Sequence, residues 1–139
     1  MELTPNLHAF LWTSTQANNC NTYLIRSPEK IILIDPGHAA YFDHVRQGLD
    51  QLGLTTEDVD LVICTHAHPD HIEAVRFFEG GSTRFALHEA EWRLVEAMGP
   101  YLQAAMNVDL SSFAPDFFLQ EGALSVGDID LEVYHTPGH

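Results

Sequence analysis

Three histidines and one aspartate crowd into the stretch THAHPDH, residues 65–71. His66 and His68 leave the end of an apolar run that is typical of a strand, and extended backbone places residues i and i+2 on the same side. A proline then turns the chain, so Asp70 and His71 enter the first turn of a following helix and point back from a second direction. We expect these four side chains to surround a space large enough for one or two cations.

Metal binding is the chemistry that these residue types favour. Imidazole suits zinc, copper, iron and nickel, and a carboxylate is acceptable to all four. A catalytic zinc ion takes three protein ligands, keeps a position for water and lowers the pKa of that water to about 7. The alternative is a group of surface histidines at a helix start, with Asp70 as an N-terminal carboxylate. The strand before the motif and the helix after it favour the metal site, because open α/β folds place their sites at the carboxyl ends of strands.

Apolar spacing predicts that strands and helices alternate along the chain. The expected strands are residues 8–14 and 21–27, which form a hairpin, then 31–34, 59–64 and 82–88, and two strands within 123–136 around the turn at Gly127 and Asp128. The expected helices are residues 41–54, 69–81 and 89–98, and residues 101–115 are ambiguous. This order indicates an α/β architecture, and 139 residues are the size of one ordinary domain.

Composition excludes several classes of function. The net charge is −14, so the surface repels nucleic acid and anionic membranes, and no nucleic-acid or membrane partner is expected. The first residues lack the basic start of a signal peptide, and no apolar run is long enough to span a bilayer. Cys20 and Cys64 are expected to be buried free thiols, which is weak support for a cytoplasmic location.

Four motifs of the sequence resemble those of the metallo-β-lactamase superfamily, and they occur along the chain in the order that the family has. THAHPDH matches its histidine-aspartate signature, NCNTYLI its second strand, IDPG the strand end that supports the site, and HTPGH the turn that presents the next ligand. Members of this family fold as an αββα sandwich built from two similar halves. The resemblance therefore implies a single, incomplete domain over residues 1–139, truncated to roughly the first half of that sandwich.

The resemblance also implies a role for each motif residue. His66, His68 and His139 would bind a first metal ion, whereas Asp70 and His71 would contribute to a second ion. Asp70 would also be catalytic, since it would orient or deprotonate the attacking water.

Support for the ligands and the identity of the metal follow from the same resemblance. Asp35 and Thr65 would stand behind the ligands and hold their loops by hydrogen bonds. The metal would be zinc, with two ions in a full-length domain, and iron is the alternative. His139 would join the other ligands if the strand within 129–136 docks beside residues 59–65.

The implied function is hydrolysis of a small-molecule ester, thioester, lactone or related substrate by a metal-activated water. Two alternatives stay open. One is a mononuclear iron enzyme that oxidises persulfides, and the other is a half-domain that binds a metal or a partner without catalysis. Glu73 and Ala74 stand where family hydrolases commonly carry small residues or glycine, which leaves the substrate subgroup open.

The end of the chain at His139 precedes the second half that family members possess. The chain is then a fragment, is complemented by another chain or by a homo-oligomer, or is a complete short form. Within the 139-residue chain itself the second ion would have only Asp70 and His71, so this chain alone is expected to be poorly active.

The remaining histidines receive simpler interpretations. His88 is expected to cap or flank a helix, and His135 is expected to be structural. His8, His38 and His44 are expected at the surface.

Overall fold

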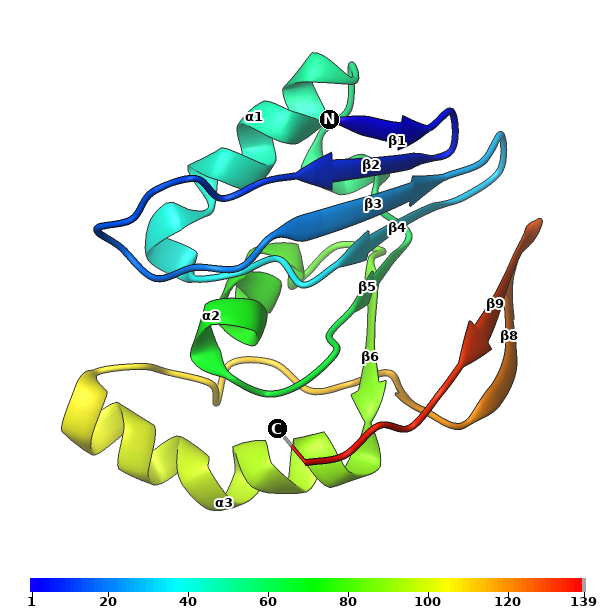
Figure 1. Ribbon diagram of the computed structural model, residues 1–139. Coiled ribbons are helices and arrows are strands. Elements are labelled where there is room, and N and C mark those ends of the chain that lie inside the picture. Colours follow the sequence, from blue (N-terminus) through cyan, green and yellow to red (C-terminus); the bar gives the residue numbers. More distant parts are fainter. Residues whose placement is uncertain (139) are drawn as a thin grey trace.

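Strands and helices alternate as expected in the computed structural model, which describes residues 1–138 (Figure 1). Seven strands form one sheet in the order β1 to β7, and β8 and β9 form a separate hairpin. The strands are β1 (Glu2–Thr4), β2 (Leu7–Phe10), β3 (Thr22–Arg26), β4 (Ile31–Ile34), β5 (Leu61–Ile63), β6 (Arg84–His88), β7 (Phe117–Leu119), β8 (Gly122–Val126) and β9 (Ile129–Val133).

The helices lie on the connections between the later strands. They are η1 (Ala39–Tyr41), α1 (Asp43–Gln51), η2 (Thr56–Asp58), α2 (Pro69–Ile72), η3 (Glu73–Phe78) and α3 (Glu89–Met106), where η denotes 3₁₀ helix. Strands β1 to β4 are antiparallel neighbours, whereas β4 to β7 run parallel to one another. The carboxyl ends of β4, β5 and β6 therefore lie at the same end of the sheet. The candidate site residues come directly after strands at this end.

Both faces of the sheet are covered, which explains the continuous apolar runs of its central strands. Leu33 and Val62 point into a large core shared with the helices. Their neighbours Ile32 and Ile63 point the opposite way, into a smaller core that the β8–β9 hairpin completes. A helical layer, a large sheet and a second β layer agree with the first half of an αββα sandwich, so the predicted fold class is confirmed.

Two strands escaped the sequence analysis. Strand β1 is exposed at every residue, and β7 is a short, half-buried FFL segment, so neither shows an alternating pattern. The surface position predicted for His8 is wrong, because β1 pairs with the outer edge of β2 and His8 is buried.

Two helices also differ from the prediction. The helix that begins at Pro69 changes after one turn into η3, because Ile72, Val75 and Phe78 are spaced by three residues and 3₁₀ winding puts them on one buried face. Helix α3 continues past Pro100 to Met106, where Asn107 ends it in the left-handed conformation. No helix within residues 1–138 is long and apolar enough to cross a membrane.

A close contact between α1 and β2 predicts an unusual response to alanine. A methyl group on Gly48 would lie 2.6 Å from the ring of Phe10, which is buried. We expect Gly48→Ala to lower the free energy of unfolding by about 1–3 kcal/mol, because overpacking outweighs the gain in helix propensity. Gly99→Ala in α3 is the matched control, since its methyl group would meet nothing within 4 Å, and we expect it to stabilise by about 0.5–1 kcal/mol. Urea denaturation measures both, and stabilisation by Gly48→Ala would contradict the packing.

Candidate metal centre

The candidate site lies where β4 and β5 end. Asp35 follows β4 directly in a left-handed conformation (φ 56°), which turns its carboxylate toward the loop after β5. Thr65 and His66 belong to that loop, and His68 is the residue before α2. The helix starts with Pro at its first position, as predicted, so Asp70 and His71 lie in its first turn.

The buried carboxylate of Asp35 holds the two sides of the site together. Its Oδ1 accepts a hydrogen bond from the backbone N–H of Thr65 at 2.8 Å. Its Oδ2 accepts from the Thr65 hydroxyl at 2.7 Å and from Nδ1 of His71 at 2.9 Å. Asp35 thus links the loop after β5 to the first turn of α2, and the predicted role of Asp35 and Thr65 in supporting metal ligands stays a prediction.

These bonds determine which ring nitrogens carry no proton. Since the Thr65 hydroxyl donates to Asp35, its oxygen accepts from Nδ1 of His66, 2.9 Å away. His71 likewise donates through Nδ1 to the same carboxylate. In their neutral forms both imidazoles then carry a lone pair on Nε2, which is the state that a metal ligand needs.

Acidic neighbours tune His71. Burial lowers the pKa of this imidazole, but the hydrogen bond and charge of Asp35, together with the charge of Asp70, outweigh burial and raise it above its ordinary value. A proton therefore competes with a cation for this ring, and metal binding at His71 should release a proton.

The remaining predicted ligands cluster around the same loop. The ring of His66 lies with its centroid 4.9 Å from that of His68 and 4.0 Å from that of His71. Oδ2 of Asp70 lies 3.8 Å from Nε2 of His71 and accepts a hydrogen bond from Asn18 at 3.1 Å. Within residues 1–138 no group of three or more His, Cys, Asp or Glu side chains is placed to hold an ion, so the metal site stays a prediction.

His139, the fifth predicted ligand, lies outside the described residues. The docking of its strand beside β5 is wrong, because β4 and β6 already occupy both edges of β5 and β9 pairs with β8 instead. The segment from Val133 to Gly138 nevertheless lines a cavity of about 200 Å³ together with Thr65 and His66. The end of this segment thus approaches the candidate ligands by another route.

Both cysteines lie beside the site but are poor candidates for ligands. They are buried free thiols, as predicted. Burial, followed by the charges of Asp35 and Asp70, raises the pKa of Cys20 to about 12, and burial raises that of Cys64 well above its ordinary value. Each thiol also contacts a backbone carbonyl, that of Asp35 for Cys20 and that of His71 for Cys64. The thiolate that binds metal is therefore disfavoured in both.

Sequence reasoning missed three residues that position the site. Asn18 bonds Asp70 as described above. Glu73 is buried, accepts from the backbone N–H of Ala39 at 2.9 Å and so ties η3 to the start of η1. Glu91 of α3 accepts from the backbone N–H of Ala67 at 2.9 Å, between two of the predicted ligands. No local pattern marks these residues, because their partners are far away in the sequence.

The other histidines have structural roles or lie beside the site. His88 caps α3, since its Nδ1 accepts from the backbone N–H of Ala90 at 3.0 Å, which confirms the predicted cap. The ring of His135 stacks on His88, with centroids 3.9 Å apart.

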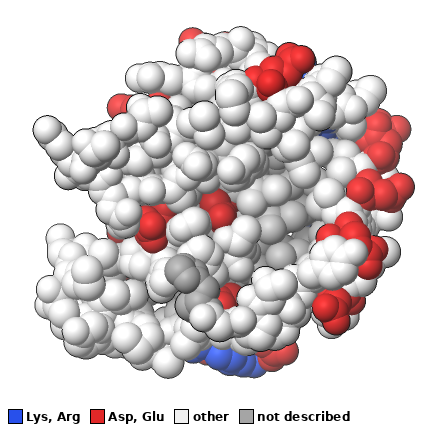
Figure 2. All heavy atoms as spheres, viewed as in Figure 1, with Lys and Arg blue, Asp and Glu red and all other residues white. Residues whose placement is uncertain are grey.

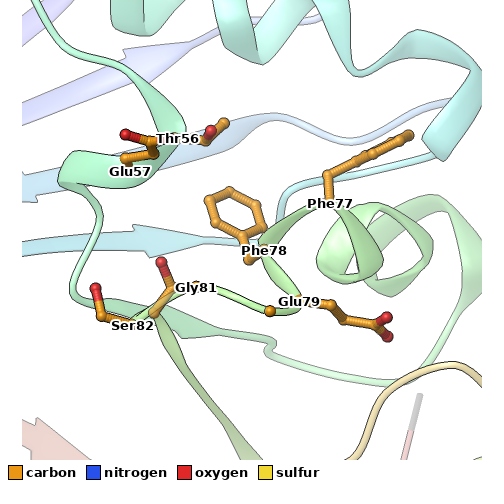
Figure 3. Close-up of a pocket in the computed structure, with 9 residues that line it drawn as sticks. Thr56, Glu57, Phe77, Phe78, Glu79, Gly81 and Ser82 are labelled. Carbon is orange, nitrogen blue, oxygen red and sulfur yellow. The ribbon is translucent and has the colours of Figure 1, made fainter.

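A separate cavity lies at the opposite, amino-terminal ends of β5 and β6. Its volume is about 490 Å³, and its walls come from Thr56, Glu57 and the segment from Phe77 to Thr83 (Figure 3). None of the predicted site residues lines it, so it is not part of the candidate metal centre.

Comparison with known proteins decides the family. The model of the metallo-beta-lactamase superfamily matches residues 15–139, which is most of the chain. The chain belongs to the metallo-β-lactamase superfamily. Among its relatives is the probable metallo-hydrolase YqgX of Bacillus subtilis (strain 168), which is 28% identical over 123 residues. That match covers 86% of this chain and 56% of YqgX.

Solved structures of metallo-β-lactamase superfamily members share the fold. The metallo-beta-lactamase family protein TTHA1429 of Thermus thermophilus superposes with a TM-score of 0.74 at 28% identity, over 99% of this chain and 54% of that protein. The metallo-beta-lactamase GOB-18 of Elizabethkingia meningoseptica gives a TM-score of 0.73 at 28% identity, over 86% of this chain and 46% of GOB-18. The chain thus spans about half the length of the relatives that it matches.

Proposed function

We propose that this protein is a metal-dependent hydrolase of small-molecule esters, thioesters or lactones. The observation that carries the proposal is the hydrogen-bond network centred on Asp35. Through Thr65 and through a direct bond, this one carboxylate sets the tautomers of His66 and His71 so that both present Nε2 as an acceptor. A structural histidine pair does not need two matched tautomers, whereas a cation does.

The donor set fits zinc. His66, His68 and His139 would hold one ion, with Asp70 and His71 at a second, and the bound metal would activate a water and polarise the scissile carbonyl. Imidazole and carboxylate are the ligands of catalytic zinc sites, and the protonated thiols of Cys20 and Cys64 are excluded from the set. Membership in the superfamily supports this assignment of a metal.

Asp70 is the candidate general base. Its carboxylate is partly buried, accepts a hydrogen bond from Asn18 and lies 3.8 Å from Nε2 of His71. These two contacts involve only its Oδ2, so the carboxylate retains acceptor capacity on Oδ1 for a water. It would accept the proton of the attacking water and pass it to the leaving group.

Hydrolysis of an ester and thioester panel tests this function in the protein at its full natural length. We expect turnover that a chelator abolishes and added Zn²⁺ restores. We expect Asp70→Asn to lower kcat by about 100-fold or more, because general base catalysis contributes roughly 10²–10⁴-fold. Asp43→Asn is the control, because this carboxylate is 83% exposed and pairs with Arg46 on the surface of α1. Failure of the zinc-loaded protein on every substrate of the panel would overturn the proposal.

A further inference from the structure

An apolar groove opens directly beside two of the predicted metal ligands. Its volume is about 340 Å³, and one wall is helix α3 with Leu94, Met98 and Leu102. His66 and His68 line its other side. We call this hollow the α3 groove. Figure 2 shows the molecular surface indented between the lobe at the bottom, where Figure 1 places α3, and the body above it.

The α3 groove has the properties of a small-molecule site. Its volume falls within the roughly 300–1,000 Å³ typical of such sites, which are mostly apolar with a few convergent polar groups. Its floor is firm, since Val95 and Leu110 are buried in the core. Its rim is open, because Leu94 and Met98 remain 51% and 44% exposed. When an apolar ligand covers large apolar side chains at an open rim, apolar surface is removed from water and the complex is stabilised.

The position of the groove decides which part of a ligand it would hold. Leu94 and Leu102 are eight residues apart on α3, so the groove wall extends about 12 Å along the helix. The same His66 also borders the smaller cavity that His88 and His135 line, on the other side of Glu91. A ligand with its carbonyl at His66 can therefore lay a chain along α3 while its polar leaving group enters the smaller cavity.

We infer that the α3 groove binds the unbranched acyl chain of the substrate, so that the protein acts on medium-chain acyl esters, thioesters or lactones. The inference deepens the proposed function and rests on it for the reaction, but binding in the groove does not require the reaction. An unbranched apolar chain matches the apolar lining, because each methylene group that leaves water stabilises the complex without requiring a particular orientation. A short acyl group such as acetyl would leave Leu94 and Met98 uncovered.

The binding test uses octanamide and acetamide, which are neutral and are not hydrolysed as esters are. Titration into the full-length protein, metal-free and zinc-loaded, is followed by NMR. We expect octanamide to bind and acetamide to show no saturation. The double variant Leu94→Gln with Met98→Gln should weaken octanamide binding about tenfold. Met106→Gln is the matched control, because Met106 is exposed on the same helix but does not line the groove, and it should change nothing.

The activity test uses p-nitrophenyl esters from acetyl to octanoyl. We expect kcat/KM to rise about threefold for each added methylene, and we expect the double variant to lose most of this rise. Octanamide binding that depends on Leu94 and Met98, without turnover of any ester, supports the groove and overturns the proposed function. Turnover without any dependence on chain length, or octanamide binding that the double variant leaves unchanged, overturns the inference. The inference is also overturned if octanamide does not bind because another segment of the full-length protein fills the groove.

Discussion

Replacing His66 with alanine should remove most of the bound metal. This imidazole is the predicted ligand whose tautomer Thr65 and Asp35 set, and its Nε2 is buried among the neighbouring rings. Loss of a ligand should weaken binding more than the roughly 10–100-fold that loss of a ligand's hydrogen-bond partner costs. We therefore expect affinity for Zn²⁺ to fall by more than about 100-fold, as measured by titration against a competing chelator.

His135→Ala is the matched control for this experiment. His135 is a nearby imidazole that lines the same small cavity, but its ring stacks on His88 instead of facing His68. Its removal should leave the metal content unchanged. Circular dichroism confirms that both variants are folded. Equal metal content in His66→Ala and the unmodified protein would refute the ligand assignment.

Asp35→Asn should reduce metal affinity by about 10–100-fold with little change in shape. Asparagine tolerates the left-handed conformation of this position, so the backbone can stay as it is. Its amide nitrogen, however, donates where the carboxylate oxygen Oδ2 accepted. Thr65 must then donate to His66 instead of accepting from it, and His71 must accept at Nδ1. Both rings would carry their proton on Nε2, which is the wrong tautomer for a metal ligand.

Two measurements separate this mechanism from simple unfolding. In the metal-free variant the pKa of His71, followed by NMR, should fall, because the hydrogen bond to the Asp35 carboxylate and its charge, which raise this pKa, are gone. Asp60→Asn is the control, since Asp60 also accepts a backbone N–H, that of Ile31 at 2.8 Å, but lies at the amino end of β5. It should leave metal affinity unchanged. Wild-type affinity in Asp35→Asn would show that the network does not set the tautomers.

The sequence predicted the parts of the fold that local patterns encode. The apolar run at Ile31–Ile34 is a strand covered on both faces, and the turn residues after it place Asp35 at the edge of the site. The order strand, tight loop, helix start around THAHPDH is also the order that the structure has. These features depend on neighbours within a few residues, so periodicity and turn chemistry reveal them.

The missed features depend on contacts between distant residues. Asn18 meets Asp70 across 52 positions, and Glu73 meets Ala39 across 34. Strand β1 carries no buried residue that would mark it, yet it buries His8 by pairing with β2. The expected docking of the terminal strand beside β5 fails for a similar reason. Only the full strand order shows that β4 and β6 lie on either side of β5. Tertiary pairing of this kind overrides local propensity.

X-ray absorption spectroscopy of the metal-loaded protein tests the central claim most directly, because it reports which atoms bind the ion. We expect nitrogen scatterers from imidazole at about 2.0–2.1 Å, together with oxygen, and the absorption edge identifies zinc or iron. We expect no sulfur scatterer, because the neighbouring thiols of Cys20 and Cys64 are held protonated. A sulfur shell near about 2.3 Å, or an ion bound by oxygen alone, would contradict the proposed ligands, which are His66, His68 and His139 for one ion and Asp70 with His71 for a second.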